Sequence, residues 1–311
     1  MQITFLGTSS GVPTKARNVS AVALKLPQRA EVWLFDCGEA TQHRLQHTEL
    51  RISQLSRIFI THLHGDHVYG LMGLLATCGM AGHAQPITIY GPAGLEEYVN
   101  TSARLSRLRL GEQISVRTVA PGLLFEDEEF AVSCQPLRHR VQAFGYRVTE
   151  KDRAGRFNVE RAAELGIPPG PVYGRLKRGE TVVLADGRTI HGADLCAPPE
   201  PGRAVAYCTD TTYCDNSVAL ARGADVLIHE ATFVSEDEDL ARQSMHSTAR
   251  DAARVAAEAR VRRLVLTHVS PRYAPGNPVT PDELLRQARA VFPDTLLAHD
   301  FMTLDVPRRV E

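Results

Sequence analysis

Residues 61–67 read Thr-His-Leu-His-Gly-Asp-His, which puts three histidines and one aspartate within six positions. Imidazole nitrogens and carboxylate oxygens are good ligands for Zn²⁺. The preceding run, residues 55–60 (Leu-Ser-Arg-Ile-Phe-Ile), is short and mostly apolar and predicts a buried strand. The motif is therefore expected on the turn where that strand ends.

This turn has enough side chains to serve two ions. We expect His62 and His64 to face one metal ion, while Asp66 and His67 face a second ion beside it. The alternative is a solvated loop that happens to be rich in histidine. Because histidine is an uncommon residue, three within six positions with an aspartate among them favour metal binding.

Three more potential ligands occur further along the chain. His139 follows the apolar run 130–134, Asp210 follows 204–209 and His268 follows 263–267. Each run predicts a strand, and the loops that follow strands are where functional sites are usually built. A single His or Asp at such a place is more often a satisfied polar group or a helix cap.

Residues 61–67 resemble the HxHxDH motif of the metallo-β-lactamase superfamily, and His139, Asp210 and His268 occur in the order of its further ligands. Strand blocks in both halves, with helices between them, suggest an α/β (α+β) protein with a four-layer αββα metallo-β-lactamase sandwich. We expect each half to contribute one sheet and the metals to lie along the edge between the sheets.

The coarse pattern assigns the main elements. We expect strands near residues 2–6, 32–38, 55–60, 86–92, 114–149, 203–211, 224–229 and 263–267, and helices near 68–81, 94–108, 249–260 and 281–291. Ser247 or Thr248 is expected to cap the Ala-rich helix that starts at 249.

Composition sets further bounds. The 311 residues are 43% hydrophobic and 23% charged, which is ordinary for a soluble globular protein. No apolar stretch approaches the ~20 residues of a membrane span, and the N-terminus does not resemble a signal peptide. Six cysteines without a CxxC pair predict reduced thiols in a cytoplasmic protein. With a net charge of −1, any nucleic-acid contact needs a local basic patch.

One stretch, residues 150–200, breaks the pattern. It is rich in Pro and Gly, and residues 166–179 hold three basic residues and no acidic one. We expect a single domain over 1–311 with 150–200 inserted as a flexible arm outside the main core. Composition alone leaves two interpretations open: a passive solvated insertion, or a projecting arm that holds phosphates.

Four further segments resemble the ribonuclease Z family, whose members remove 3′ trailers from precursor tRNA. Residues 13–18 (Pro-Thr-Lys-Ala-Arg-Asn) resemble its PxKxRN loop, 229–232 (His-Glu-Ala-Thr) its HEAT motif, 246–248 (His-Ser-Thr) its HST motif, and 166–179 its tRNA-gripping exosite arm. The resemblance spans nearly the whole chain and includes every ligand position.

The resemblance implies a site and a mechanism. It implies two Zn²⁺ ions per chain, one bound by His62, His64 and His139, the other by Asp66, His67 and His268, with Asp210 as the bridge. Two metals ~3.5–4 Å apart can stabilise both ends of a phosphodiester displacement. Asp66 would also orient or deprotonate the attacking water, His246 would protonate the leaving 3′-oxygen, and Glu230 would hold that imidazole.

The resemblance also implies the contacts to precursor tRNA. Lys15 and Arg17 would touch the RNA near the acceptor end, and the arm would contribute Arg175, Lys177 and Arg178. The family further implies a homodimer in which the arm of one subunit holds tRNA that the other subunit cleaves.

Each of these segments also has a structural interpretation. Lys15 and Arg17 can be solvated loop charges, and His229 with Glu230 can be a buried polar pair at a strand end. Ser247 or Thr248 caps a helix whatever His246 does, so only the histidine is surplus to structure.

Three other functions compete. The first is another hydrolase of the same fold that acts on a small phosphodiester, a thioester or a lactone, which leaves the 166–179 arm unexplained. The second is a di-iron redox protein, which usually carries a carboxylate where this chain has His64. The third is a non-catalytic RNA-binding module with a structural zinc, although such sites tend to be closed and single.

Overall fold

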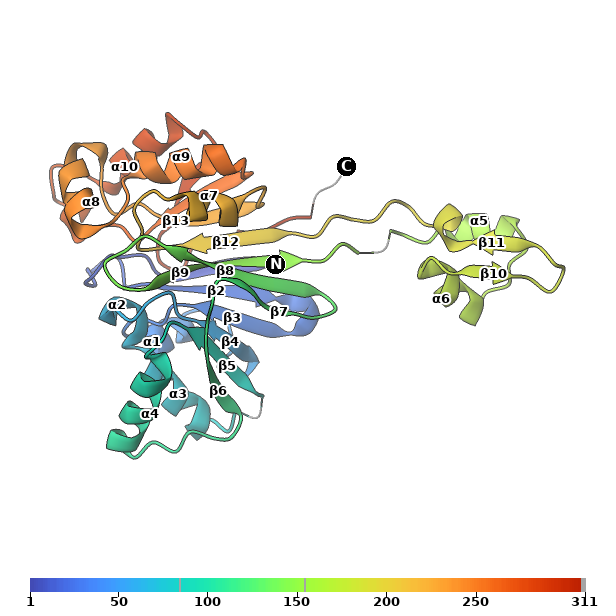
Figure 1. Ribbon diagram of the computed structural model, residues 1–311, viewed down its shortest axis with the longest axis horizontal. Coiled ribbons are helices and arrows are strands. Elements are labelled where there is room, and N and C mark those ends of the chain that lie inside the picture. The colour runs from blue at the N-terminus through green and yellow to red at the C-terminus, as the bar shows by residue number, and fades with distance from the viewer. Residues whose placement is uncertain (84, 154, 309–311) are drawn as a thin grey trace. The chain divides into compact units, whose positions relative to one another are not determined.

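The computed structural model describes residues 1–83, 85–153 and 155–308 (Figure 1). The chain divides into two compact units. The main unit comprises Met1–Thr149 and Ala204–Pro307, and the inserted unit comprises Glu150–Arg203 with Arg308.

The main unit contains two seven-stranded sheets (Figure 1). The first has the order β16-β1-β2-β3-β4-β5-β6, built from β16 (Thr303–Asp305), β1 (Gln2–Gly7), β2 (Ala21–Leu26), β3 (Glu31–Phe35), β4 (Leu55–Phe59), β5 (Ile87–Gly91) and β6 (Ile114–Thr118). The second has the order β15-β14-β13-β12-β9-β8-β7, built from β15 (Thr295–Leu297), β14 (Arg263–Thr267), β13 (Val226–Glu230), β12 (Ala204–Cys208), β9 (Ala143–Glu150), β8 (Phe130–Leu137) and β7 (Gly122–Glu126).

Helices cover the outer face of each sheet, which completes four layers (Figure 1). The first sheet is covered by α1 (Thr41–Gln46), α2 (Gly65–Val68), α3 (Leu71–Met80) and α4 (Leu95–Ser106). The second is covered by α7 (Asp215–Ala221), α9 (Ala249–Ala259) and α10 (Pro281–Arg289), while α8 (Glu238–Ser244) lies in the connection between β13 and α9. Short 3₁₀ turns lie at η1 (Pro27–Arg29), η2 (Ile52–Gln54), η4 (Ser235–Asp237) and η5 (Pro271–Tyr273).

Three buried apolar clusters fill the three gaps between these layers. Successive side chains of a strand point to opposite faces of the sheet, so one strand contributes residues to the clusters on both of its faces. In β3, Trp33 and Phe35 lie between the sheets, while Val32 and Leu34 face the helices. This alternation confirms the four-layer sandwich that the sequence predicts.

The strands are shared between the sheets differently from the expectation that each half of the chain forms one sheet. β7, β8 and β9 come from the first half but belong to the second sheet. The C-terminal β16 returns to the first sheet and pairs antiparallel with β1, where Gln2 lies opposite Asp305. β9 and β12 also pair antiparallel, because the chain returns after the insertion to the strand it left.

The helix starts are locally encoded. Thr248, one of the two expected caps, accepts a hydrogen bond from the Asp251 backbone N–H, and the Asp251 side chain accepts one from the Thr248 backbone. This capping box satisfies donors that a helix start leaves unpaired. It fixes where α9 begins and therefore where the loop before it, with His246, must end.

The inserted unit has a small core of its own. It contains α5 (Val159–Glu164), α6 (Pro171–Lys177), a hairpin of β10 (Thr181–Val183) and β11 (Thr189–His191), and η3 (Gly192–Leu195). Its buried cluster consists of Ala162, Ile167, Leu176, Val182 and Leu195. The three main clusters take no residue from this segment.

A buried carboxylate ties the two chain segments at the start and end of this unit. Glu150 is bound by Arg203 at 2.6 and 3.0 Å, by Arg153 at 3.3 Å and by Arg308. Burial raises the pKa of Glu150, but the guanidinium groups outweigh burial and lower it overall.

Among the helices of the described residues, none has the length and apolar character that a membrane span requires.

Candidate active site

The seven ligand candidates come together in the main unit, in loops that follow strands. His62, His64, Asp66 and His67 follow β4, His139 follows β8, Asp210 follows β12 and His268 follows β14. β12, β13 and β14 run parallel, so their carboxyl ends lie at one edge of the second sheet. Their donor atoms form two groups: His62, His64, His139 and Asp210, and Asp66, His67 and His268. A third group overlaps them and joins Asp210 and His268 to His246.

The first group surrounds one point with three imidazole nitrogens and one carboxylate oxygen. His64 Nδ1 lies 3.0 Å from His62 Nε2 and 3.3 Å from His139 Nε2. Asp210 Oδ2 lies 3.4 Å from His62 Nε2 and 3.8 Å from His139 Nε2. Hydrogen bonds among neutral imidazoles and one carboxylate cannot satisfy all four of these atoms, whereas a cation at their centre could bind all four.

The second group lies beside the first and shares Asp210. His67 Nε2 and His268 Nε2 are 3.3 Å apart, and Asp66 Oδ2 lies 3.3 and 3.4 Å from them. Asp210 Oδ1 lies 3.2 Å from His67 Nε2 and 3.1 Å from His268 Nε2. The two oxygens of Asp210 therefore face different groups, which is the arrangement of a bridging carboxylate.

These distances fit metal ions. Ligands about 2.0–2.1 Å from a tetrahedral ion lie about 3.3 Å from one another. The donor set of imidazole nitrogens and carboxylate oxygens also suits zinc and similar divalent ions. The chemistry and the spacing of these donors therefore fit the binding of metal ions.

A second ring of polar groups fixes the histidines from behind. His67 Nδ1 lies 2.8 Å from Asp36 Oδ2, and His62 Nδ1 lies 3.0 Å from Thr61 Oγ1. His268 Nδ1 lies 3.0 Å from Thr232 Oγ1. Such partners orient the ring and leave the other nitrogen free for a metal.

Asp36 contacts the candidate site but was not among the residues predicted from the sequence. Its carboxylate also accepts hydrogen bonds from the backbone and hydroxyl of Thr61 and from the hydroxyl of Tyr207. The available signal was its position directly after β3, the same kind of position that the ligands occupy. Nothing in a single aspartate distinguishes it from a cap, so the contact to His67 had to come from the structure.

Three site residues have left-handed backbone conformations. Asp36, Asp210 and His268 have φ values of 58°, 51° and 58°. Such conformations cost on the order of 1–3 kcal/mol each for residues other than glycine and concentrate at functional sites. The fold accepts this cost at the ends of three strands, where it turns the side chains toward the donor groups.

The electrostatics favour a bound cation. Burial lowers the pKa of His62, His64 and His139 and keeps them in the neutral form that binds metals. Burial acts the same way on His67, but Asp210, Asp36 and Asp66 outweigh it and raise its pKa. Three carboxylates around one imidazole concentrate negative charge where a cation would be stabilised.

His246 lies beside the ligands without being needed by either group. Its Nδ1 is 2.9 Å from Glu230 Oε1, and its ring centroid lies 5.1 Å from that of His139 and 5.3 Å from that of His268. Burial alone would lower the pKa of His246, but Glu230 outweighs it and raises the pKa to about 9. Glu230 therefore favours the protonated form of His246.

Glu230 is held in turn by its own donors. It is fully buried at the end of β13, where the Thr211 N–H donates to Oε1 at 2.7 Å and the Thr232 hydroxyl donates to Oε2 at 2.5 Å. Because Thr232 also contacts His268, one short network connects the ligand shell to His246.

The predicted loop cations have different surroundings. Lys15 is exposed. The Arg17 guanidinium donates to the Thr8 hydroxyl at 2.7 Å and to the Ala298 carbonyl at 2.6 Å, so it also ties the loop in place. The same loop donates the Gly11 N–H to Asp66 Oδ2 at 2.8 Å. A contact of Lys15 or Arg17 with RNA stays a prediction.

Asp300 is a second residue that the sequence did not single out. It accepts hydrogen bonds from the Thr8 hydroxyl and the Asn18 N–H, both at 2.7 Å, and pairs with Arg44 at 2.5 Å. It thus holds both ends of the loop that reaches Asp66. Its partners are more than 250 positions away in sequence, which is why no local pattern pointed to it.

The predicted arm cations lie on or next to α6 in the inserted unit. Glu180 pairs with Arg175 and with Arg178, each at 2.9 Å, and all three side chains are substantially exposed. Lys177 is exposed as well. The arrangement places three cations and one carboxylate on one short stretch.

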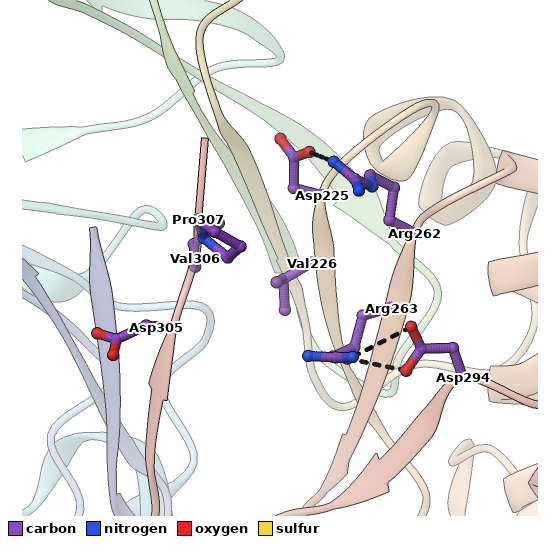
Figure 2. Close-up of a pocket in the computed structure, with 8 residues that line it drawn as sticks. All are labelled: Asp225, Val226, Arg262, Arg263, Asp294, Asp305, Val306 and Pro307. Carbon is purple, nitrogen blue, oxygen red and sulfur yellow. Dashed lines mark hydrogen bonds and ion pairs between the residues drawn. The ribbon is translucent and has the colours of Figure 1, made fainter. Parts of the chain in front are cut away.

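A pocket of the main unit lies at the amino ends of β13 and β14, opposite to the strand ends that carry the ligand candidates (Figure 2). It has a volume of about 130 Å³ and lies at the start of β13 and β14 and the end of β16. Its arginines are already paired, Arg262 with Asp225 at 3.5 Å and Arg263 with Asp294 at 2.8 Å. Since the ligands follow the carboxyl ends of the strands, this pocket is separate from the metal site.

Comparisons with known proteins agree with this geometry. A family model described as "Anti-Pycsar protein Apyc1" matches residues 1–142, and one described as "Beta-lactamase superfamily domain" matches residues 195–269. The chain is 63% identical to a ribonuclease Z of Nostoc sp. over 100% of this chain and 97% of that protein, and 62% identical to one of Gloeothece citriformis over 99% and 97%.

A solved structure is similar over the same length. The crystal structure of human tRNase Z, short form, matches with a TM-score of 0.70 and 32% identity, covering 99% of this chain and 100% of that one. The long form from yeast matches with a TM-score of 0.66 at 18% identity, over 98% of this chain and 42% of that one, which supports the fold alone.

Proposed function

The chain belongs to the ribonuclease Z family, and on that premise we propose that it is a metal-dependent endoribonuclease that removes the 3′ trailer from precursor tRNA. The observation that carries the proposal is the pair of donor groups that share Asp210, with His246 beside them. Hydrolysis would leave a 3′-hydroxyl on the tRNA and a 5′-phosphate on the trailer.

The metals in this proposal are two Zn²⁺ ions per chain. His62, His64 and His139 would hold one, Asp66, His67 and His268 the other, and Asp210 would bridge them. When bound, two divalent cations stabilise the charge on the phosphoryl oxygens and activate the attacking water. The seven donors support this count, because one tetrahedral ion takes only four.

The chain's own residues would then move the protons. Asp66 would orient or deprotonate the attacking water, and the Gly11 N–H fixes its Oδ2 in place. His246 would donate a proton to the leaving 3′-oxygen, and Glu230 keeps that imidazole oriented and protonated. Glu230 acts through His246 and is therefore a positioning residue.

The remaining roles concern binding and assembly. Lys15 and Arg17 would contact RNA near the acceptor end, and Arg175, Lys177 and Arg178 would hold tRNA phosphates through a flexible inserted unit. We expect a homodimer that works in the cytoplasm, with the arm of one subunit holding the tRNA that the other cleaves. These assignments rest on the family resemblance.

The first prediction tests the activity itself. End-labelled precursor tRNAs, with and without an encoded CCA, should be cut at the 3′ side to give a tRNA 3′-hydroxyl and a 5′-phosphorylated trailer. Mapping the product ends measures this. If bis(p-nitrophenyl) phosphate is hydrolysed but no precursor tRNA is cut, the protein is a different hydrolase of the same fold.

The second prediction concerns the metals. Elemental analysis of protein purified without added metal should find two divalent ions per chain. His64→Ala should lower that number and abolish most phosphodiesterase activity, because it removes one donor from the first group. His43→Ala, at an exposed position of α1, is the matched control and should change neither. Full activity in the His64 variant would refute the assignment.

The third prediction separates proton donation from metal binding. His246→Ala should keep its metals and lose on the order of 10²–10⁴ in the rate of the chemical step. Glu230→Gln should lower the pKa of His246, because the carboxylate is what raises it. The protonated form then disappears at lower pH, so the alkaline fall of the rate should move to lower pH.

The outcome that contradicts this role is also specific. Donor atoms of His246, Asp210 and His268 already lie within 4.8 Å of one another. If His246→Ala loses metal in parallel with activity, the residue is a ligand and the acid must be sought elsewhere.

The fourth prediction concerns the arm. A triple substitution of Arg175, Lys177 and Arg178 by Ala leaves the core residues Ile167 and Leu176 in place. It should weaken precursor tRNA cleavage and reduce the salt slope by about one for each phosphate that the variant no longer binds. Hydrolysis of bis(p-nitrophenyl) phosphate, which is too small to reach the arm, should be unchanged.

Arg161→Ala, an exposed cation of α5, is the control for a charge removed elsewhere in the inserted unit. If both substrates lose turnover in the triple variant, the segment is structural. If neither does, it is a passive insertion.

A further inference from the structure

A pocket of about 460 Å³ lies beside His246 in the main unit. Residues from four places in the chain form it: Arg138 after β8, Thr212 and Tyr213 after β12, residues of α8 and just beyond it that include Arg242 and His246, and Asp251 of α9. None of the seven metal-ligand candidates lines it. The pocket is therefore on a side of His246 that the ligands leave open.

The walls of this pocket are tied to the ligand shell. The Arg138 N–H donates to the Thr211 hydroxyl at 3.1 Å, and the Thr212 N–H donates to the Arg138 carbonyl at 3.0 Å. Arg138 directly precedes the ligand His139, whose Nδ1 lies 3.0 Å from the Met245 carbonyl. A group bound in the pocket would thus be held at a fixed position relative to the metal site.

One cation of the pocket has no counter-charge. Among the described residues, no ion pair is formed by the exposed Arg138 side chain, whereas Arg242 pairs with Glu238 at 2.5 Å. Asp251, which also lines the pocket, is engaged by its side chain in the capping box of α9. Arg138 is therefore the side chain best placed to meet an anion, and its guanidinium suits a phosphate.

The other walls suit a nucleoside. The Tyr213 ring is fixed by a hydrogen bond from its hydroxyl to Glu258 at 2.6 Å and by the Arg254 guanidinium 4.1 Å from the ring centroid. The Thr212 hydroxyl oxygen has no hydrogen-bond partner in the described part of the chain. A ribose hydroxyl could satisfy it after a small shift, and the volume lies within the ~300–1,000 Å³ range of ligand pockets.

We propose that this pocket holds the nucleotide that carries the leaving 3′-oxygen, the last nucleotide of the mature tRNA, with Arg138 bound to the phosphate on its 5′ side. The inference rests on the proposed function. His246 lines the pocket and gives its proton to the 3′-oxygen of that same nucleotide. The nucleotide must therefore lie within reach of His246, and this pocket adjoins it without including the ligands.

The test combines a protein variant with a substrate variant. Arg138→Ala should lower kcat/KM for precursor tRNA about tenfold or more, since it removes a charged hydrogen bond. A neutral methylphosphonate in place of the phosphate 5′ of the last nucleotide should lower kcat/KM of the wild type by about the same factor. The same substrate should not lower kcat/KM of the Arg138→Ala variant any further. That non-additivity identifies a direct contact. Hydrolysis of bis(p-nitrophenyl) phosphate should stay within about twofold.

Arg250→Ala is the matched control, because it removes the same charge from an exposed position nearby that does not line the pocket. It should leave kcat/KM within about twofold. The proposal would be overturned if Arg138→Ala left kcat/KM for precursor tRNA unchanged, or if the effects of Arg138→Ala and the methylphosphonate were additive. It would also be overturned if Arg138→Ala lowered the hydrolysis of bis(p-nitrophenyl) phosphate by the same factor, since Arg138 would then serve the metal site.

These outcomes are distinct from failure of the proposed function. If the wild type does not cut precursor tRNA at all, the function itself is refuted. If it cuts normally and Arg138→Ala has no effect, only the pocket assignment is refuted.

Discussion

The negative charge of Asp210 is buried between two groups of nitrogen donors, and loops that follow strands of both sheets meet at this carboxylate. Only 2% of the residue is exposed, and each of its oxygens faces a different group. A buried carboxylate is costly unless it is paired or coordinates a metal. The loops after β4, β8, β12 and β14 must therefore meet at one point, and both sheets have to be present for that to happen. The four-layer sandwich is the frame that brings strand ends from both sheets to this carboxylate.

The same constraint explains the groups around the ligands. Asp36 and Glu230 are buried acids at the ends of β3 and β13, and each is satisfied by hydroxyl or backbone donors before it reaches an imidazole. Their roles differ. Asp36 fixes His67, whereas Glu230 holds His246, which neither of the two groups joined by Asp210 requires. The site thus has one histidine that Asp36 orients within the donor groups and one whose pKa Glu230 raises, to which the proposed function gives the proton transfer.

The sequence was sufficient to single out the seven ligand candidates that the structure brings together, because two independent signals coincide at those positions. Histidine and aspartate are specific in chemistry, and each ligand follows an apolar run whose strand character is easy to recognise. The sequence was insufficient for residues whose hydrogen-bond partners lie far away along the chain. Asp36 and Asp300 look like ordinary polar residues until His67 and the loop at Thr8 are placed beside them. β16 has only three residues, too few for a period, and its place beside β1 is decided by tertiary pairing. In the inserted unit, helices of six and seven residues among Gly and Pro are likewise too short to show a helical period.

The distribution of charge shows how a protein with a net charge of −1 can bind a polyanion. Its arginines occur in two kinds of environment. Around the buried Glu150, three guanidinium groups are needed by the fold, because separating a buried pair leaves an uncompensated charge. Around the exposed Glu180, Arg175 and Arg178 form ion pairs that contribute little and are easily exchanged in water. One carboxylate there balances two arginines, so the cluster keeps a positive excess to which Lys177 adds. A phosphate can replace Glu180 as a partner at low cost, whereas no phosphate could replace Glu150 without loosening the unit. In the proposed function, the local excess of exchangeable cations, and not the net charge of the protein, is therefore the quantity that would govern the binding of RNA to this unit.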